Sequence, residues 1–236
     1  MKNKEFYKDY FESIYRSSNK LSECNYGDTN KFYELNYKKF LPGDKNAKIL
    51  DIGCGVGDFL FYLKKEGYKN IHGIDISQQQ IEYCRKNISQ DAENVDAIEY
   101  LREKKDEFDL IVANDLIEHI SKNVIVEFIG LVREALKENG TVIMKTGNCG
   151  NPFGIRVRYV DFTHSVGFTE KSLYQVFWMG EFRNIEIIPN ILPKGRIRAK
   201  IINYILKKMF WYQGFVAPEI MSHLLIAVAK KQTTDA

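Results

Sequence analysis

Cysteine is scarce in this sequence, and no two cysteines stand at a metal-binding or redox spacing. The four are Cys24, Cys54, Cys84 and Cys149, and none of them belongs to a CxxC pair. Their positions therefore indicate neither a zinc site nor a dithiol motif. The first residues, 1–6, are too polar for the apolar core of a secretory signal. We therefore expect reduced thiols and a cytoplasmic protein.

Long apolar runs and a strong charge bias are also missing. The longest uncharged stretches, such as 209–218, have about half of the length that a membrane-spanning helix needs. The net charge of +3 is too small to indicate nucleic-acid binding by itself, and the sequence has no internal repeat. Of the 236 residues, 44% are hydrophobic, which is enough for one sizeable core with appendages.

The pattern of apolar residues divides the chain into two parts. Residues 1–46 are polar and rich in aromatic side chains, and several of these within 6–15 stand near helical spacing. We expect this part to form a helical N-terminal cap, either a lid over a ligand site or a layer packed on the sheet. A turn sequence at 42–44, Pro-Gly-Asp, breaks the chain there, and residues 47–236 are expected to form the main domain.

Short apolar strands alternate with helices from residue 48 onward. Strands are expected at 48–52, 71–75, 95–97, 108–113 and 141–145, and helices at 58–65, 77–87 and 124–137. A long connection at 147–167 is followed by a helix at 169–179, a strand at 184–189, a helix at 194–210 and a strand at 223–229. This order predicts an α/β fold with a doubly wound, seven-stranded, mainly parallel sheet and an antiparallel edge. Such sheets bind ligands at the carboxyl ends of their strands.

The segment LDIGCGVGD at 50–58 places three glycines at alternate positions directly after the first strand. Gly53, Gly55 and Gly57 permit positive φ angles and a close approach of a ligand to the backbone, and the amides at the start of the next helix favour a polar or anionic group. The GxGxG spacing, with no Lys-Ser/Thr after it, excludes a P-loop and weakens a dinucleotide assignment. Asp51, directly before the loop, would repel a pyrophosphate and attract a cation.

Two further acids follow the next strands. Asp75 ends the second predicted strand, where a carboxylate can accept both hydroxyls of a ribose. Asp96 lies in the third predicted strand, near the place where an adenine amino group would lie. Together with the glycine loop, these acids indicate a ligand that contains a nucleoside.

Five segments in this order resemble the motifs of class I S-adenosylmethionine-dependent methyltransferases: ILDIGCGVGDF, IHGIDIS, VDAIEYL, FDLIVANDLIEHI and LKENGTVIMK. The resemblance covers residues 48–146 and implies a Rossmann-like methyltransferase fold with S-adenosylmethionine as the cofactor. It implies that the glycine loop, including Cys54, lies against the methionine and ribose part of the cofactor. The other cofactor-binding residues that it implies are Asp75 and Ile76 at the ribose, Asp96 and Ala97 at the adenine, and Asn114 and Leu116 after the fourth strand. A sulfonium donor also fits the acid at Asp51 better than a dinucleotide does.

The segment YVDFTHSVGFTEKSL at 159–173 carries the candidate acceptor chemistry. Thr169 is expected to cap a helix there. An alcohol acceptor must lose a proton during methyl transfer, and a neutral imidazole suits that task. His164 is our first candidate for this base, with Asp161 orienting it or binding the substrate. His119, which follows the fourth strand, is the rival candidate, and a reaction with no essential base is the third interpretation.

The pattern DFTH…FT..SL resembles that of methyltransferases from bacterial capsule, O-antigen and other surface-glycan biosynthesis. The resemblance implies a sugar hydroxyl of a glycan precursor as the acceptor, with a phosphate-type oxygen or another small metabolite as alternatives. A non-catalytic partner subunit with the same fold is the alternative of another class. Asp115, Asp161 and Asn148 do not have the spacing of a metal site, so no metal is expected.

The helix predicted before the last strand is basic and amphipathic. Residues 194–212 contain six Lys or Arg residues and no acid, together with an apolar stripe at helical spacing. Three interpretations are open: a weak contact with a membrane surface, an anion site for a phosphorylated or nucleotide-linked substrate, and an ordinary helix that covers the sheet or a homodimer partner. No nucleic-acid partner is expected, because no such binding module is recognised.

Overall fold

The computed structural model describes residues 25–192 and 196–232. Its sheet has seven strands in the order β3-β2-β1-β4-β5-β7-β6. The strands are β1 (Ile49–Ile52), β2 (Ile71–Asp75), β3 (Ala92–Asn94), β4 (Phe108–Asn114), β5 (Leu136–Gly147), β6 (Asn184–Pro189) and β7 (Leu224–Lys230). Strands β1 to β5 pair in parallel, while β7 runs antiparallel to both of its neighbours, β5 and β6. The predicted doubly wound sheet with an antiparallel edge is confirmed.

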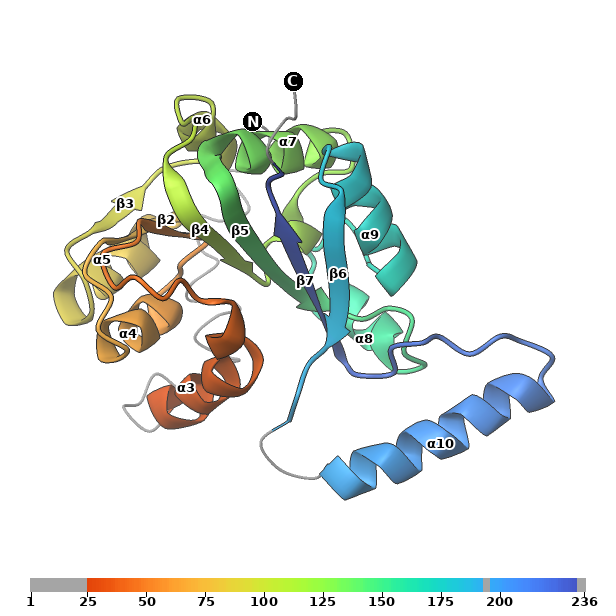
Figure 1. The fold of residues 1–236 in the computed structure, drawn as a ribbon. Coiled ribbons are helices and arrows are strands. Elements are labelled where there is room, and N and C mark those ends of the chain that lie inside the picture. The colour runs from red at the N-terminus through yellow and green to blue at the C-terminus, as the bar shows by residue number, and fades with distance from the viewer. Residues whose placement is uncertain (1–24, 193–195, 233–236) are drawn as a thin grey trace.

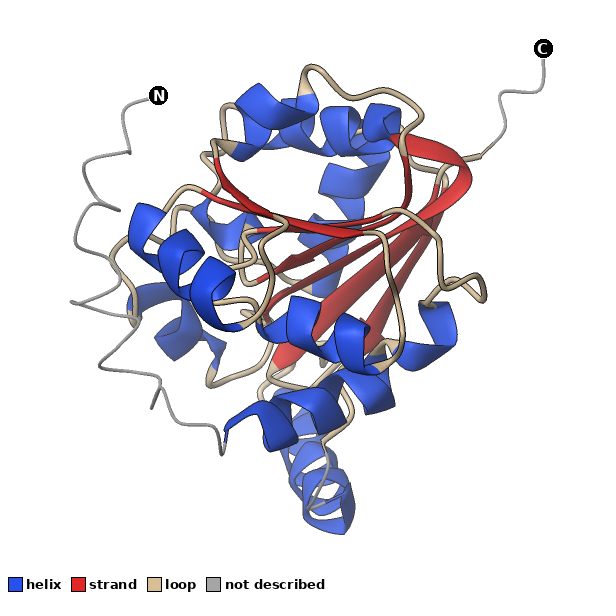
Figure 2. Cartoon of the chain, turned by 90° about the vertical axis from the view of Figure 1, so that its left-hand side faces the viewer, coloured by secondary structure: helices blue, strands red, loops and turns tan. Residues whose placement is uncertain are grey.

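Helices cover both faces of this sheet (Figures 1 and 2). One face carries α3 (Asn25–Asn36), α4 (Asp58–Lys65) and α5 (Gln78–Asn87), and the other carries α6 (Ala97–Leu101), α7 (Ile125–Ala135) and α9 (Glu170–Met179). The remaining helices are α8 (Gly154–Tyr159) and α10 (Arg196–Tyr212), with 3-10 turns η2 (Lys38–Phe40) and η3 (Ile117–His119). Within the described ranges, none of the helices combines the length and the apolar character that crossing a membrane requires.

Strand β1 shows how the sequence builds two cores. All four of its side chains are buried, and they alternate between the two faces of the sheet, as the period of a strand requires. Ile49 packs into the core under α3, α4 and α5, whereas Leu50 and Ile52 pack into the core under α6, α7 and α9. By the same alternation, Asp51 shares the face of Ile49. An acidic side chain is thereby buried on the face of the sheet that carries α3, α4 and α5.

The third strand and the residues after it differ from the prediction. The strand is Ala92–Asn94 rather than 95–97, and the helix α6 occupies residues 97–101. Asp96 is the N-cap of this helix, and its carboxylate accepts two backbone amides of the first turn at 2.9 and 3.1 Å. In sequence alone, a capping acid and an acid that ends a strand look the same, because each follows an apolar residue.

Other boundaries differ in smaller ways. Helix α7 ends at Ala135 rather than at residue 137, because β5 begins at Leu136 and is 12 residues long. Thr169 caps α9 as predicted, and its hydroxyl accepts the amide of Ser172. The helical segment predicted within 6–15 lies outside the described residues.

A matched pair of glycine substitutions tests the packing of α7 against α9. A Cβ at Gly180 would lie 2.7 Å from the Cβ of buried Ile129, so Gly180→Ala overpacks this contact and should destabilise the protein by about 1–3 kcal/mol. A Cβ at Gly130 meets no neighbouring atom within 4 Å, and Gly130→Ala in the helix interior should stabilise the protein by about 0.5–1 kcal/mol. Urea unfolding measures both changes, and shifts of the same sign would contradict this packing.

Candidate functional site

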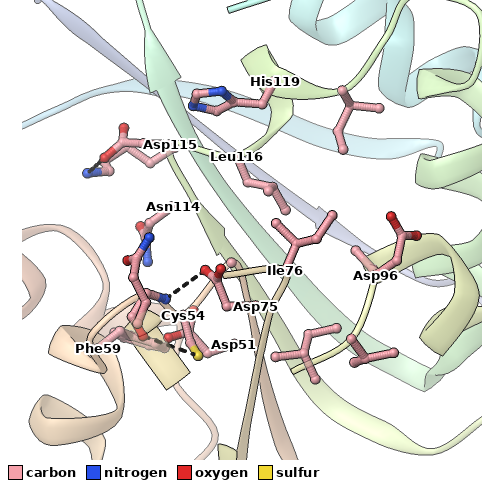
Figure 3. Close-up of a pocket in the computed structure, with 18 of the residues that line it drawn as sticks. Asp51, Cys54, Phe59, Asp75, Ile76, Asp96, Asn114, Asp115, Leu116 and His119 are labelled. Atoms are coloured by element: carbon pink, nitrogen blue, oxygen red, sulfur yellow. Dashed lines mark hydrogen bonds and ion pairs between the residues drawn. The ribbon is translucent and has the colours of Figure 1, made fainter. Parts of the chain in front are cut away.

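A cavity of about 780 Å³ opens at the carboxyl edge of the sheet, where the strand order reverses between β1 and β4. Its walls come from the loop after β1, the end of β2, the loop after β3, the loop after β4 and helix α3 (Figure 3). This volume is typical of pockets that hold small molecules and cofactors. Ten of the eleven residues predicted to bind the cofactor line the cavity: Asp51, Gly53, Cys54, Gly55, Asp75, Ile76, Asp96, Ala97, Asn114 and Leu116.

The loop after β1 adopts the conformation that its glycines allow. Gly53, Gly55 and Gly57 have positive φ angles of 70°, 55° and 94°, which other residues rarely adopt. Gly57 is the predicted residue that does not line the cavity. It is the N-cap of α4, and a Cβ there would lie 2.7 Å from Sγ of Cys84. The first two glycines therefore border the cavity, while the third allows close packing against α5.

Asp75, at the end of β2, holds the glycine loop in place. Its carboxylate accepts hydrogen bonds from the amides of Gly55 (3.0 Å) and Ser77 (2.7 Å). Burial raises the pKa of Asp75, and these two N–H groups lower it because they favour the charged form. A carboxylate oxygen has two lone pairs, so each oxygen can also accept a hydroxyl of a ligand. Ser77 is the N-cap residue of α5, but its side chain makes no capping hydrogen bond.

Asp51 lies in the cavity wall with an unsatisfied carboxylate oxygen. The residue is 2% exposed, and its Oδ1 has no hydrogen-bond partner within the described part of the chain. Burial raises the pKa of Asp51 well above its usual value, and the neighbouring groups of Cys84 and Asp75 raise it further. Because a buried acceptor without a partner is costly, a ligand that brings a donor or a positive charge to this position would be stabilised.

Helix α3 and the residue directly after it carry two tyrosines that the sequence analysis did not assign to the site. Tyr33 lines the cavity, and its ring lies 4.9 Å from that of Phe59. The hydroxyl of Tyr37 donates to Oδ1 of Asn114 at 2.6 Å. The four-residue spacing of the two tyrosines could have indicated that they share one helix face. The described part of the predicted cap thus contributes to the wall of the cavity.

The three residues predicted for catalysis come together beside the loop after β4. His119, in η3, and His164 both line the cavity, and their ring centroids are 4.7 Å apart. Figure 3 shows His119 next to Leu116 at one end of the group of labelled residues. Asp161 is buried, and its Oδ1 accepts the amide of Thr163 at 2.8 Å and its hydroxyl at 2.7 Å.

Hydrogen bonds assign the tautomers of both histidines. Thr163 gives its single hydroxyl proton to Asp161, so in its 2.9 Å contact with Nδ1 of His119 the ring nitrogen must donate. Nδ1 of His164 lies 2.8 Å from the carbonyl oxygen of Val157, which can only accept. Nε2 is therefore the unprotonated nitrogen of each neutral ring. Burial, and then the neighbouring imidazole of His164, lower the pKa of His119 to about 4, so this ring is neutral at pH 7.

Glu118 connects the two segments that carry the histidines. Its backbone carbonyl accepts the amides of Ser165 (2.7 Å) and Val166 (3.1 Å). Its buried carboxyl group accepts the hydroxyl of Thr146 at 2.9 Å. Burial, and then the charge of Asp115, raise the pKa of Glu118 to about 8, so the group is mainly protonated at neutral pH. Only its place beside His119 in the sequence could have indicated its importance.

One set of groups in the described ranges could hold a metal ion. The ligand atoms of His119, Asp161 and His164 lie within 4.8 Å of one another. Asp115 and Asn148 do not belong to it. Asp115 forms an ion pair with a lysine at 2.5 Å, and buried Asn148 donates its amide protons to two backbone carbonyls.

Comparison with known proteins indicates the family. A family model described as a methyltransferase domain matches residues 27–187, which is more than half of the chain. An uncharacterized protein of Rickettsia prowazekii is 35% identical over 209 residues, which are 81% of this chain and 82% of that protein. The ubiquinone biosynthesis O-methyltransferase of Pelagibacter ubique is 36% identical over 108 residues, 44% of this chain and 43% of the relative. That match therefore spans less than half of either protein.

A solved structure shows the same fold. The crystal structure of a SAM-dependent methyltransferase from Archaeoglobus fulgidus superposes with a TM-score of 0.65 at 21% identity, covering 89% of this chain and 94% of that one. At this identity, the likeness shows the fold alone. With the family match, it leads to one conclusion: the chain belongs to the class I S-adenosylmethionine-dependent methyltransferases, and its cofactor is S-adenosylmethionine.

Proposed function

We propose that this protein transfers the methyl group of S-adenosylmethionine to an oxygen atom of a small acceptor bound beside His119 and His164. The observation that carries the proposal is the pair of imidazoles that line the cofactor cavity, each with Nε2 unprotonated in the neutral ring. A base of this kind is needed by a hydroxyl acceptor, which must lose a proton, and is not needed by a neutral amine, whose lone pair can attack directly.

The acceptor that we propose first is a sugar hydroxyl in the biosynthesis of a bacterial surface polysaccharide. Support for it comes from the resemblance of residues 159–173 to methyltransferases of capsule and O-antigen biosynthesis. A phosphate-type oxygen or another small metabolite is the alternative. Among the relatives, the ubiquinone biosynthesis enzyme is by name an O-methyltransferase, which supports an oxygen acceptor without specifying which one.

The residues of the cavity fit the proposed binding mode of the cofactor. Asp51 offers a buried carboxylate oxygen without a partner in the described protein, which suits the positive charge of the methyl donor. Asp75 has lone pairs for the two ribose hydroxyls. The capping hydrogen bonds of Asp96 both go to Oδ1, so Oδ2 can accept the adenine amino group while the helix cap is kept.

The acceptor side needs alignment and a base. Holding the acceptor oxygen in line with the methyl group can contribute about 7–11 kcal/mol, and general-base catalysis about 10²–10⁴-fold. As the C–O bond forms and the C–S bond breaks, Nε2 of His119 takes the hydroxyl proton. The chain from Nδ1 through Thr163 to the carboxylate of Asp161 stabilises the resulting imidazolium. This proposal prefers His119 to His164, our first candidate, because the Asp161–Thr163 chain contacts the ring of His119.

Calorimetry and product detection test the function. We expect the protein to bind S-adenosylmethionine and to form S-adenosylhomocysteine with at least one hydroxyl acceptor from a panel of nucleotide-linked sugars, sugar phosphates, free sugars and phenols. Failure to bind the cofactor would remove the enzyme assignment. Cofactor binding without product on any acceptor would favour the non-catalytic partner subunit instead.

Substitution of Asp75 tests the cofactor side. Asp75→Ala removes the charged acceptor for the ribose and releases the amide of Gly55, so the Kd for S-adenosylmethionine should rise roughly 10–100-fold, as expected for hydrogen bonds to a charged group. Titration calorimetry measures the Kd. Asp91→Ala, at an exposed acid near β3 that does not line the cavity, is the matched control. An unchanged Kd in Asp75→Ala would contradict the ribose assignment.

The pH profile and two histidine variants test the base. Activity requires neutral His119, and a lowered pKa extends the neutral form to lower pH. The acidic limb of kcat/KM should therefore lie well below the ordinary imidazole value of about 6.5. His119→Asn should lower kcat by about 10²–10⁴-fold and leave the cofactor Kd within a few-fold. An acidic limb at the ordinary value, or a larger loss in His164→Asn, would show that His119 is not the base.

A further inference from the structure

Helix α10 presents large apolar side chains to solvent. It extends away from the sheet at the lower end of the molecule in Figure 1. Eight of its apolar residues are between 51% and 83% exposed: Ile197, Ile201, Ile202, Tyr204, Ile205, Met209, Trp211 and Tyr212. Leu206, by contrast, is only 9% exposed. Burying an aliphatic or aromatic side chain is favourable, so this helix has a surface suited to a further partner.

The same helix is strongly basic. Arg198, Lys200, Lys207 and Lys208 are exposed on it, and the sequence from 190 to 218 contains no Asp or Glu. Basic side chains, exposed aliphatic side chains and a terminal Trp-Tyr pair together are typical of helices that lie in a membrane interface. The charge selects an anionic surface, and the aliphatic side chains select one with an apolar layer beneath it.

A second patch of the same character lies on α8 and on the residues directly before and after it. Five large apolar residues there are between 66% and 85% exposed: Phe153, Ile155, Tyr159, Val160 and Phe162. Arg156 and Arg158 lie among them. Both α8 and α10 lie at the lower end of the molecule in Figure 1, as does α3, which lines the cavity. His164 follows Phe162 by two residues, so this patch adjoins the histidine side of the cavity.

We propose that α10 and the α8 patch form a docking surface for membranes rich in anionic lipids. Helix α10 lies along the interface, with its apolar side chains among the acyl chains and its lysines and Arg198 at the headgroups. This surface also places the histidine side of the cavity near the membrane. The inference rests on the exposed surface alone and holds whichever acceptor the enzyme methylates.

Charge favours a lipid surface over a second copy of the chain. A symmetric dimer places one patch against itself, which would bring the basic residues of two α10 helices together without an acid from 190–218 to neutralise them. The exposed Ile and Met side chains equally disfavour nucleic acid, because a phosphate backbone offers them no apolar partner. Anionic lipid satisfies both the charge and the apolar area.

Vesicle binding by the full chain tests the proposal. We expect the protein to co-sediment with phosphatidylcholine vesicles that contain about 30% phosphatidylglycerol, and to bind pure phosphatidylcholine roughly tenfold or more weakly. Salt should weaken the binding to anionic vesicles. The chain has two tryptophans, so in Trp178→Phe the fluorescence reports on Trp211 alone and should shift to shorter wavelength on the anionic vesicles.

Variants separate the docking surface from the methyltransferase site. The double variant Lys200→Glu and Lys207→Glu should lower affinity for anionic vesicles roughly tenfold or more, and Ile201→Gln with Ile205→Gln should also lower it. Lys86→Glu, at an exposed position of α5, is the charge control and should have little effect. All three proteins should bind S-adenosylmethionine as the wild type does.

Three results would overturn the proposal. They are equal binding to neutral and anionic vesicles, no binding to either, and a concentration-dependent dimer in which Trp211 is shielded without lipid. Because cofactor affinity is measured on the same variants, failure of the docking surface is distinguishable from failure of the proposed function.

Discussion

The geometry of the cavity depends on one carboxylate that accepts hydrogen bonds from two separate turns. The amide of Gly55 belongs to the turn after β1, and the amide of Ser77 belongs to the turn after β2, yet both donate to Asp75. This side chain therefore links the two turns, together with the backbone hydrogen bonds from Gly53 and Cys54 to the carbonyl oxygen of Ile74. The positive φ angles at Gly53 and Gly55 give the loop the course that brings its amide to this carboxylate.

The histidine side of the cavity is assembled differently, from segments that follow β4 and β5. The backbone carbonyl of Glu118 ties the turn that contains His119 to the connection that contains His164. Burial disfavours charge in both ionisable groups of this turn, because it raises the pKa of Glu118 and lowers that of His119. Glu118 and His119 are therefore both mainly uncharged at neutral pH.

The sequence predicted the features whose patterns lie within a short segment of the chain, such as the strands and the glycine loop. Gly53, Gly55 and Asp75 lie where the motif places them, because a parallel sheet brings the ends of neighbouring strands to one edge. Residues whose importance depends on a distant partner were missed. The contact of Tyr37 with Asn114 joins positions 77 residues apart, and the Thr163–His119 contact joins positions 44 apart. The role of Asp96 as a helix cap was also missed. The sequence analysis places Asp96 in a strand, whereas in the structure its carboxylate accepts amides of the first turn of α6.

The order of the last strands has a consequence for folding during synthesis. Strand β7 is made after β6 but lies between β5 and β6, so β6 has no partner in the sheet until β7 arrives. Until then, the edge of β5 has open backbone hydrogen-bonding groups, which invite pairing with other chains. A ribosome that pauses between these two strands would hold a nascent chain in this aggregation-prone state, and chaperone capture at that stage would protect it.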